Sequence, residues 1–301
     1  MDANKTILVT GATGAQGGGV ARHLLAAGRF TVRAATRKPD SPAASALKEA
    51  GAEVVEADMD DVESLKRALA GCYGVFGVTN FWEHFAKERD HGMNLVAAVA
   101  ASNVEHFVFS SLPSVKKFAP ELNVPHFELK AEIEADARRR SLPLSAVHAA
   151  FYYENFIAFF PPQKQEDGTF AIGFPQGETP LAAVAVEDVG GVVARIFEDR
   201  ETFLGKTIVV AGDELPAAEY AAIMSRELAK PIRYNHIPRE VFAGFGFPGA
   251  EDLADMFEFY RSRIPSRKPD IEHARHLYPG LQAFAPWVRR HKEALLARLT
   301  A

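Results

Sequence analysis

Three glycines near the start of the chain, Gly11, Gly14 and Gly17, have the spacing of a phosphate-binding turn. In such a turn the first glycine permits a sharp exit from a strand, and the second lets backbone N–H groups approach a pyrophosphate. The third lets the next helix pack close to the strand. A glycine string alone arises by chance, but the apolar run at 7–9 and the amphipathic stretch at 15–27 supply the strand and the helix. The stretch therefore predicts a dinucleotide site, with the pyrophosphate at the helix N-terminus.

The residues about twenty positions further on decide which dinucleotide the site prefers. An NAD-preferring site places an acid there for the ribose 2′-hydroxyl, but this chain has Arg37 and Lys38, followed by Ser41. A guanidinium fork and an ammonium both suit a 2′-phosphate, and the serine could donate a further hydrogen bond. A solvated basic loop is the alternative. The pattern favours NADP(H) over NAD(H).

Polar residues also stand where later strands are expected to end, at the edge of the sheet that binds ligands. Asp58 directly follows the third predicted strand, where its carboxylate could accept a hydrogen bond from an adenine amino group. Asp60 with Glu63 has the pattern of a capping box for the next helix. We therefore assign Asp58 to the cofactor and Asp60 to the cap. Residues 110–111, both serine, could cap a loop or serve the site, and the sequence leaves both open.

Two later segments could reach the nicotinamide end of a bound dinucleotide. Lys130 lies in a predicted helix that opens at Val124-Pro125, and we expect it to point toward the sheet edge. A surface lysine is the alternative. The stretch 150–156, A-F-Y-Y-E-N-F, could wall a nicotinamide ring, although aromatic residues at such spacing more often belong to a core.

Alternating strands and helices must position these residues. The pattern predicts an α/β fold with a doubly wound, parallel, Rossmann-type sheet and a smaller, mainly helical C-terminal lobe. We expect a dinucleotide-binding core at 1–155 and the smaller lobe at 156–301, with some of its segments returning to the core sheet. The predicted strands are 7–9, 31–36, 52–56, 74–78, 106–109, 144–147 and 207–210. The predicted helices include 41–51, a long one reaching 102, 188–197, 216–228, 250–260 and 287–299, and residues 159–168 are expected to form a loop.

Composition gives no reason to expect a nucleic acid or a membrane as a direct ligand. The 301 residues are 48% hydrophobic and 24% charged, with a net charge of −5. The first residues, M-D-A-N-K, lack an apolar signal region, and no apolar run approaches the length of a membrane span. We expect a cytoplasmic protein, with the nucleus as a second compartment. The single cysteine, Cys72, excludes an intrachain disulfide and predicts a structural thiol near a strand start, and no metal site is expected.

The sequence resembles the NmrA-like family of atypical short-chain dehydrogenase/reductase relatives, and in particular its NADPH-sensor branch. The resemblance runs nearly end to end. The segment at 246–257 is the most specific to that branch, because it lies outside the general dinucleotide fold. The matching stretches are G-A-T-G-A-Q-G-G at 11–18, V-R-A-A-T-R at 32–37, G-A-E-V-V at 51–55, V-T-N-F-W-E at 78–83, H-F-E-L-K at 126–130, F-Y-Y-E-N-F at 151–156 and G-F-P-G-A-E-D-L-A-D-M-F at 246–257.

The resemblance implies a cofactor contact for each matching position. It places Gly11, Ala12, Thr13, Gly14, Ala15 and Gln16 at the pyrophosphate, Arg37, Lys38 and Ser41 at the 2′-phosphate, and Asp58 and Met59 at the adenine. It places Thr79, Asn80 and Phe81 near the ribose and phosphates, Lys130 at the nicotinamide ribose, and Tyr152, Tyr153, Glu154 and Asn155 near the nicotinamide.

The chain departs from the wider group at the residue that would transfer a proton. Active short-chain dehydrogenases use Tyr-x-x-x-Lys, in which the lysine lowers the pKa of the tyrosine. Four residues before Lys130 this chain has His126. An imidazole can exchange protons near neutral pH, so Lys130 or His126 could still serve a reductase of a quinone or enone-like substrate. The resemblance favours instead an NADP(H)-binding redox sensor with little or no turnover, acting through a regulatory protein partner or a homodimer.

Overall fold

The computed structural model describes residues 5–85 and 87–300, which divide into two compact units. The first unit comprises the chain up to Ser114, His126–Ala149 and Val186–Val210. The second comprises Val115–Pro125, Ala150–Ala185 and the chain from Ala211 onward. Each unit is described by itself.

The first unit is built on a parallel sheet in the order β11-β6-β5-β4-β1-β2-β3. Its seven strands are β1 (Thr6–Val9), β2 (Thr31–Thr36), β3 (Glu53–Glu56), β4 (Gly74–Gly77), β5 (His106–Ser111), β6 (Leu144–Ala149) and β11 (Thr207–Val210). The strand order reverses between β1 and β4, and this reversal is the point where ligands bind in open α/β sheets. The predicted α/β, Rossmann-type fold is confirmed.

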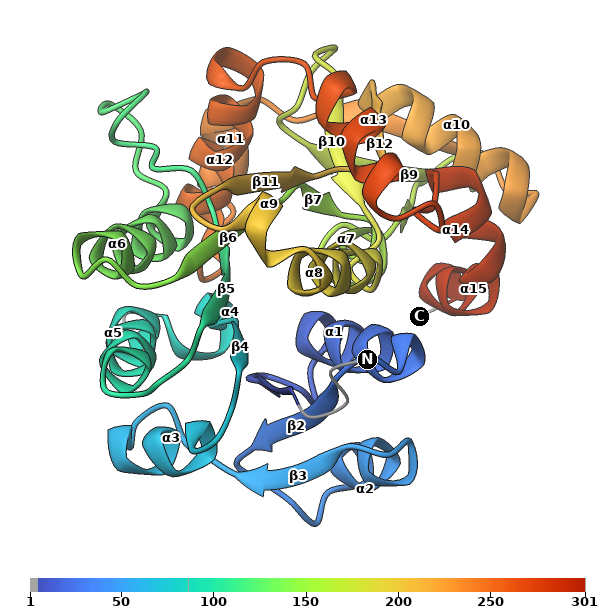
Figure 1. Cartoon of the computed structure of the whole chain (residues 1–301). Coiled ribbons are helices and arrows are strands. Elements are labelled where there is room, and N and C mark those ends of the chain that lie inside the picture. Colours follow the sequence, from blue (N-terminus) through green and yellow to red (C-terminus); the bar gives the residue numbers. More distant parts are fainter. Residues whose placement is uncertain (1–4, 86, 301) are drawn as a thin grey trace. The chain divides into compact units, whose positions relative to one another are not determined.

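Helices cover both faces of this sheet. They are α1 (Ala15–Ala27), α2 (Pro42–Glu49), α3 (Val62–Leu69), α4 (Phe81–His84), α5 (Lys87–Ala100), α6 (Pro125–Arg139), α8 (Asp188–Glu198) and α9 (Arg200–Phe203). In Figure 1, α3, α5 and α6 lie along one face, and α1, α2 and α8 along the other. A cluster that includes Leu8, Leu65, Leu95 and Phe107 fills the space under α3 and α5, because their apolar stripes face the sheet. Cys72 is buried in the same cluster, and its burial raises the pKa of the thiol.

The second unit combines two small sheets with helices. Its strands are β7 (Phe151–Tyr152), β8 (Gln163–Lys164), β9 (Phe170–Phe174), β10 (Leu181–Val184), β12 (Asp213–Leu215) and β13 (Ile232–His236). Its helices are α7 (Asn155–Ala158), α10 (Ala217–Leu228), α11 (Arg239–Ala243), α12 (Ala250–Arg263), α13 (Lys268–Leu277), α14 (Phe284–Arg290) and α15 (Lys292–Thr300). The strands pair in the orders β12-β10-β7 and β13-β9-β8. An aromatic core that includes Phe156, Phe174 and Phe257 holds this unit together.

Three predicted elements differ from the observed ones. The helix expected to run on to residue 102 has a separate first turn, α4, because Phe85 adopts a left-handed conformation (φ 46°) before α5 begins. The segment 159–168 is not a loop throughout, since β8 pairs antiparallel with β9. The helix expected at 287–299 is divided into α14 and α15 at His291.

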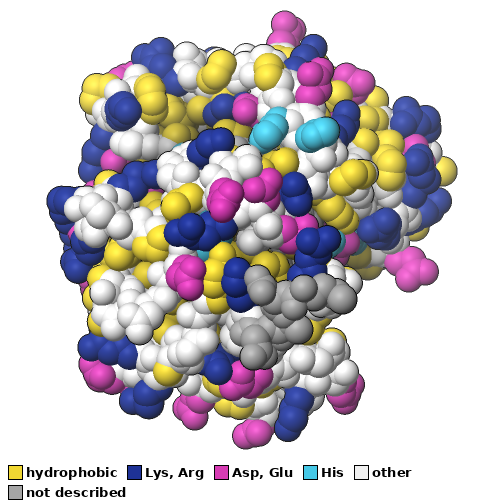
Figure 2. Space-filling view, viewed as in Figure 1, with side chains coloured by type: hydrophobic (Ala, Val, Ile, Leu, Met, Phe, Trp, Pro, Cys, Tyr) yellow, Lys and Arg dark blue, Asp and Glu magenta, His cyan; other side chains and the backbone are white. Residues whose placement is uncertain are grey.

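The surface carries charges of both signs. On the face drawn in Figure 2, Lys and Arg side chains alternate with Asp and Glu side chains over the area that the described residues cover. Among residues 5–85 and 87–300, no helix has both the length and the apolar character that crossing a bilayer requires.

Candidate functional site

The glycine-rich turn connects the carboxyl end of β1 to the start of α1. Gly11 has φ 59°, in the left-handed region, and its carbonyl accepts a hydrogen bond from the N–H of Gly14 at 2.9 Å. A Cβ atom on Gly17 would lie 2.3 Å from the Gly11 oxygen, so only glycine fits there. Ala12 is buried, whereas Thr13 to Ala15 are exposed at the helix N-terminus. The first N–H groups of α1 lack partners within the helix, which suits an anionic ligand.

Hydrogen bonds fix this turn to the neighbouring strands. The Thr10 hydroxyl accepts a hydrogen bond from the N–H of Val78, just after β4, at 2.9 Å. The Gln16 side-chain amide donates to the Ser110 hydroxyl at 2.8 Å. Ser110 and Ser111 belong to β5 itself, so they do not follow the strand as predicted. The Ser111 hydroxyl donates to the backbone oxygen of Lys130 at 3.2 Å. Both serines therefore hold parts of the predicted site in place.

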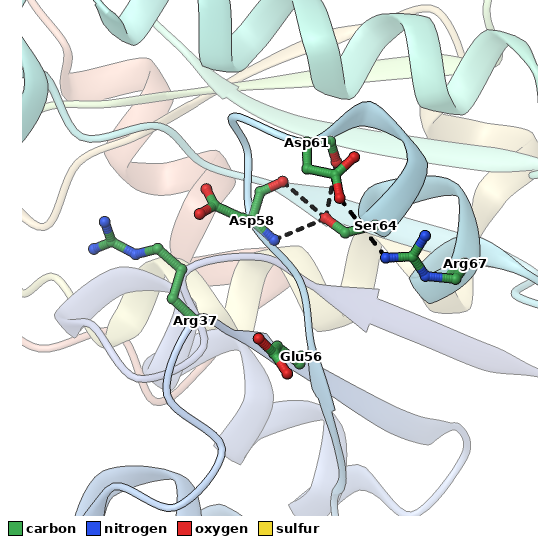
Figure 3. Close-up of a pocket in the computed structure, with 6 residues that line it drawn as sticks. All are labelled: Arg37, Glu56, Asp58, Asp61, Ser64 and Arg67. Atoms are coloured by element: carbon green, nitrogen blue, oxygen red, sulfur yellow. Dashed lines mark hydrogen bonds and ion pairs between the residues drawn. The ribbon is translucent and has the colours of Figure 1, made fainter.

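A polar pocket of about 320 Å³ opens at the carboxyl ends of β2 and β3. It is lined by Arg37, Glu56, Asp58, Asp61, Ser64 and Arg67. Figure 3 shows the Asp58 carboxylate on the same side of the pocket as Arg37. The Ser64 hydroxyl fixes the Asp58 backbone, because it accepts from its N–H and lies within hydrogen-bond distance of its carbonyl, both at 3.0 Å. The pocket therefore contains Asp58, one of the two residues predicted for the adenine, and Arg37, one of the three predicted for the 2′-phosphate.

The helix cap predicted next to this pocket was wrong by one residue. Asp61 caps α3, because its Oδ1 accepts a hydrogen bond from the N–H of Glu63 at 2.9 Å. Asp60 instead lies 3.0 Å from His91 Nε2 and 3.4 Å from Lys87 Nζ, both on α5. The cap therefore lies one residue later than predicted, since either of the two adjacent aspartates can start a helix.

Of the three residues predicted for the 2′-phosphate, only Arg37 lines the pocket. Its Nη2 donates to Glu83 Oε1 at 2.7 Å, which lowers the pKa of the Glu83 carboxyl. Lys38 is exposed outside the pocket lining. The Ser41 hydroxyl caps α2 by accepting from the N–H of Ala44 at 3.3 Å. The backbone oxygen of Met59, the second adenine candidate, accepts from the Asn94 side chain at 2.8 Å.

Lys130 meets the end of β4 through a buried hydrogen-bond network. Its ammonium lies 2.9 Å from both the carbonyl and the hydroxyl oxygen of Thr79, and 2.7 Å from Glu88 Oε1. The Thr79 hydroxyl donates to the same Glu88 oxygen at 2.7 Å, and Glu88 is fully buried. An ammonium has three N–H donors, and three protein oxygens surround this one. Lys130 therefore points to the sheet edge as expected, and it is not a surface lysine.

His126 is enclosed by aromatic rings one helical turn before Lys130. It is buried, with ring centroids at 5.8 Å from Phe81, 5.2 Å from Trp82 and 4.8 Å from Phe127. The neighbouring Asn80 is exposed and donates from Nδ2 to Glu83 Oε2 at 3.2 Å. The first unit therefore brings Thr79, Asn80, Phe81, His126 and Lys130 together at the end of β4.

The four residues predicted for the nicotinamide belong to the second unit and have packing roles there. Tyr153 is fully buried against Phe284 and Trp287, with centroids at 5.0 and 5.5 Å. Glu154 Oε1 accepts a hydrogen bond from the Trp287 indole at 3.0 Å. Asn155 begins α7, and burial raises the pKa of the β7 residue Tyr152. Within this unit the aromatic residues form a core, the alternative that their spacing had left open.

Sequence reasoning missed the two acids that pair with Arg37 and Lys130. Glu83 lies 46 positions from Arg37 in the sequence, and no local sequence pattern predicts that the two residues pair. Glu88 lies in the charged run K-E-R-D at 87–90, which resembles a solvated helix start. Its helical spacing to Leu95 and Val99, both buried, was the available signal, because it places Glu88 on the inward stripe of α5.

Curated relatives match most of the chain. An NmrA-like family domain-containing oxidoreductase of Cladobotryum sp, FrzB, is 34% identical over 278 residues, 84% of this chain and 83% of that protein. The corresponding oxidoreductase hkm9 of Aspergillus hancockii is 33% identical over 273 residues, 84% of this chain and 82% of that protein.

Solved structures share the fold. The negative transcriptional regulator NmrA in complex with NADP superposes with a TM-score of 0.82 at 24% identity, covering 97% of this chain and 98% of that one. The Escherichia coli NADPH-dependent quinone oxidoreductase QOR2, complexed with NADPH, gives 0.79 at 21% identity, covering 94% and 99%. The sequence model of the NmrA-like family matches residues 3–283, so the chain belongs to the NmrA-like family.

Proposed function

We propose that this protein binds NADP(H) as a redox signal and turns it over little or not at all. In this proposal the Gly11 to Gln16 turn holds the pyrophosphate, and Asp58 with Met59 faces the adenine. Arg37 is the principal ligand of the 2′-phosphate, with Lys38 and Ser41 near it. Thr79, Asn80, Phe81 and Lys130 would lie along the riboses, and Tyr152, Tyr153, Glu154 and Asn155 near the nicotinamide.

The cofactor assignment is supported by the shape and charge of the first unit. Gly11 and Gly14 are exposed in the turn, and α1 directs its N-terminus there. Arg37 lies where an NAD-preferring site would have an acid, and a guanidinium fork matches a phosphate. Structures of NmrA are described as complexes with NAD and with NADP, so the fold accommodates both cofactors.

The contacts of Lys130 are the observation that favours a redox sensor over an enzyme. Its ammonium is surrounded by the Glu88 carboxylate and both Thr79 oxygens, and the position of the usual catalytic tyrosine holds the buried His126. A lysine whose N–H donors are bound by protein oxygens in this way has a structural role, because it fixes the segments that carry Thr79 and Glu88. We further propose that the bound cofactor alters contact with a regulatory protein or with a second copy of the chain, in the cytoplasm or nucleus.

The test combines calorimetry with a turnover assay on the same preparation. We expect NADPH to bind at least about tenfold more tightly than NADH. We expect NADPH oxidation against a panel of carbonyls and quinones to stay well below about 1 per second, the low end of the ordinary enzyme range. Equal affinities for NADPH and NADH would remove the NADP(H) assignment.

The second candidate function is an NADPH-dependent reductase of a quinone or enone-like molecule. It is favoured by the names of FrzB and hkm9, which are both called oxidoreductases. In this case Lys130 or His126 would donate the proton that accompanies hydride transfer. Steady oxidation at about 1 per second or faster, abolished in Lys130→Ala while NADPH binding persists, would establish this alternative.

A further inference from the structure

The carboxylate of Glu83 engages the same guanidinium that the proposed function assigns to the 2′-phosphate. Arg37 Nη2 donates to Glu83 Oε1 at 2.7 Å, and Asn80 Nδ2 donates to the other oxygen, Oε2, at 3.2 Å. Both oxygens of Glu83 are therefore held. A phosphate that takes the Arg37 donor must displace this carboxylate or share the donor with it.

We propose that Glu83 makes the site respond to the 2′-phosphate and not to the dinucleotide as a whole. The inference rests on the proposed function, because it requires the 2′-phosphate to bind Arg37. A ribose without this phosphate leaves the Arg37–Glu83 pair intact. A ribose with it brings a second negative group to the same guanidinium, and in this proposal the phosphate takes the Arg37 donor and displaces Glu83. The ligand with the 2′-phosphate therefore favours the arrangement in which Glu83 is displaced from Arg37, over the one in which the two are paired. A switch requires such a difference in affinity between two arrangements.

The pair is weak enough to be exchanged. The Arg37 and Glu83 side chains are 51% and 50% exposed, so solvent screens their attraction. A phosphate offers several strong acceptor oxygens and the geometry to bind a guanidinium with two donors. The phosphate therefore makes a stronger interaction with Arg37 than Glu83 does. Because Glu83 must first be displaced, its ion pair with Arg37 lowers the measured affinity for the phosphate.

Glu83 is also connected to the far end of the predicted site through α4. This helix has four residues, and each of its side chains contacts a residue outside the helix. Phe81 and Trp82 lie on the His126 ring, at 5.8 and 5.2 Å between centroids, and His84 lies on His91 at 4.7 Å. Glu83 and Trp82 are adjacent in this single turn, so the contacts with Arg37 and His126 hold it from two sides. Release of Glu83 should therefore change the packing of Trp82 on His126.

The first arm of the test uses 2′,5′-ADP (adenosine 2′,5′-bisphosphate) and 5′-AMP, which differ only in the 2′-phosphate and contain no nicotinamide. Calorimetry on Glu83→Gln should show 2′,5′-ADP binding about two- to fivefold more tightly than to the unmodified protein, the range expected for losing one exposed ion pair. The affinity for 5′-AMP should stay unchanged. Glu132→Gln is the matched control, because Glu132 pairs with Arg89 at 3.0 Å with similar exposure, 37% and 51%. It should leave both affinities unchanged.

The second arm follows Trp82 directly. The chain has two tryptophans, so protein labelled with 5-fluorotryptophan gives two ¹⁹F signals, which Trp82→Phe assigns. We expect 2′,5′-ADP to shift the Trp82 signal and 5′-AMP to leave it in place. In Glu83→Gln the Trp82 signal should differ from that of the unmodified protein before any nucleotide is added. The Trp287 signal, from a buried ring, reports that the variant is folded.

The outcomes separate this inference from the proposed function. If the unmodified protein prefers 2′,5′-ADP but Glu83→Gln does not change that affinity, or both nucleotides move Trp82 equally, the role of Glu83 is refuted and NADP(H) binding stands. A loss of 5′-AMP affinity in Glu83→Gln would make Glu83 a ribose ligand and also refute it. If the unmodified protein binds both nucleotides equally, or neither, the proposed function itself fails.

Discussion

The ammonium of Lys130 lies 2.7 Å from the carboxylate of Glu88, a side chain that is fully buried in the first unit. This pair connects α6 with α5, and Thr79 adds the end of β4 to the same network. Lysine and glutamate are rarely buried to this degree unless they are paired. The pair therefore fixes three elements at the edge of the sheet where ligands are expected to bind.

Removing the acid of this pair should destabilise the protein strongly. Glu88→Gln leaves the Lys130 ammonium, whose side chain is 13% exposed, without its counter-charge. Breaking a buried ion pair in this way costs about 3–5 kcal/mol. Urea denaturation should show a loss of this size in the free energy of unfolding.

The surface pair Arg89–Glu132 provides the comparison for that measurement. Glu132→Gln should change the free energy of unfolding by less than about 1 kcal/mol, because the pair is exposed. A similarly small loss in Glu88→Gln would show that solvent reaches Lys130 and that the network does not hold the three elements.

Replacing the pocket arginine should act on one cofactor only. Arg37→Ala removes a charged donor from the 2′-phosphate, which typically costs about 1.5–3 kcal/mol, or roughly tenfold or more in affinity. Calorimetry should show this loss for NADPH and little change for NADH. Lys38→Ala should cost less, because Lys38 does not line the pocket. Equal losses for NADPH and NADH in Arg37→Ala would place the arginine elsewhere on the ligand.

A methyl group at the third glycine should disrupt the turn. In Gly17→Ala the new Cβ would lie 2.3 Å from the Gly11 oxygen and 2.5 Å from the Thr10 oxygen. Overpacking of this kind costs about 1–3 kcal/mol of stability, and the displaced turn should bind NADPH more weakly. Gly18→Ala is the control, since its nearest contact would be 3.1 Å. Thermal unfolding and calorimetry should rank Gly17→Ala as the more damaging, and the opposite order would contradict the close approach.

Stability should fall as the solution is acidified from about pH 6.5 toward pH 4. Burial lowers the pKa of His106 to about 4, and its ring nitrogen Nε2 lies 2.8 Å from the Ser145 hydroxyl. An unfolded histidine, with a pKa near 6.5, binds a proton in this interval while the folded one does not, so unfolding is favoured there by about 2–3 kcal/mol.

His106→Asn should flatten the pH dependence of unfolding between pH 6.5 and 4, whatever its effect on the stability at pH 7. His276→Asn, at an exposed position, should leave the slope as it is. Denaturation curves at a series of pH values give the free energy of unfolding of each variant, from which the two slopes are compared. An unchanged slope in His106→Asn would mean that other groups cause the acid sensitivity.

Local patterns were sufficient to predict the sheet and the glycine-rich turn. The strand Thr207–Val210 was predicted with its observed bounds, because a short β-branched run between the glycines at 205 and 212 has few alternatives. Gly11 and Gly17 were recognised because a left-handed conformation and a close backbone contact exclude other residues.

Relations between distant residues could not be predicted in the same way. The Arg37–Glu83 and Lys130–Glu88 pairs depend on how elements that are distant in the sequence pack together. The sequence around each glutamate does not show that Glu83 is exposed and Glu88 buried. The left-handed Phe85 that separates α4 from α5 also lacks a local signal, since phenylalanine rarely adopts this conformation. The misplaced helix cap, predicted at Asp60 and observed at Asp61, reflects two equally suitable caps side by side.

The central claim, that the cofactor is a signal read through its 2′-phosphate, is tested most directly by hydrogen exchange with saturating NADPH and with saturating NADH. Both should protect the backbone from Gly11 to Gln16, since both contain a pyrophosphate. The account predicts that only NADPH changes the exchange of residues 79–85, where Glu83 and Trp82 lie. Identical exchange of residues 79–85 in the two complexes, with protection confined to the glycine-rich turn, would contradict it.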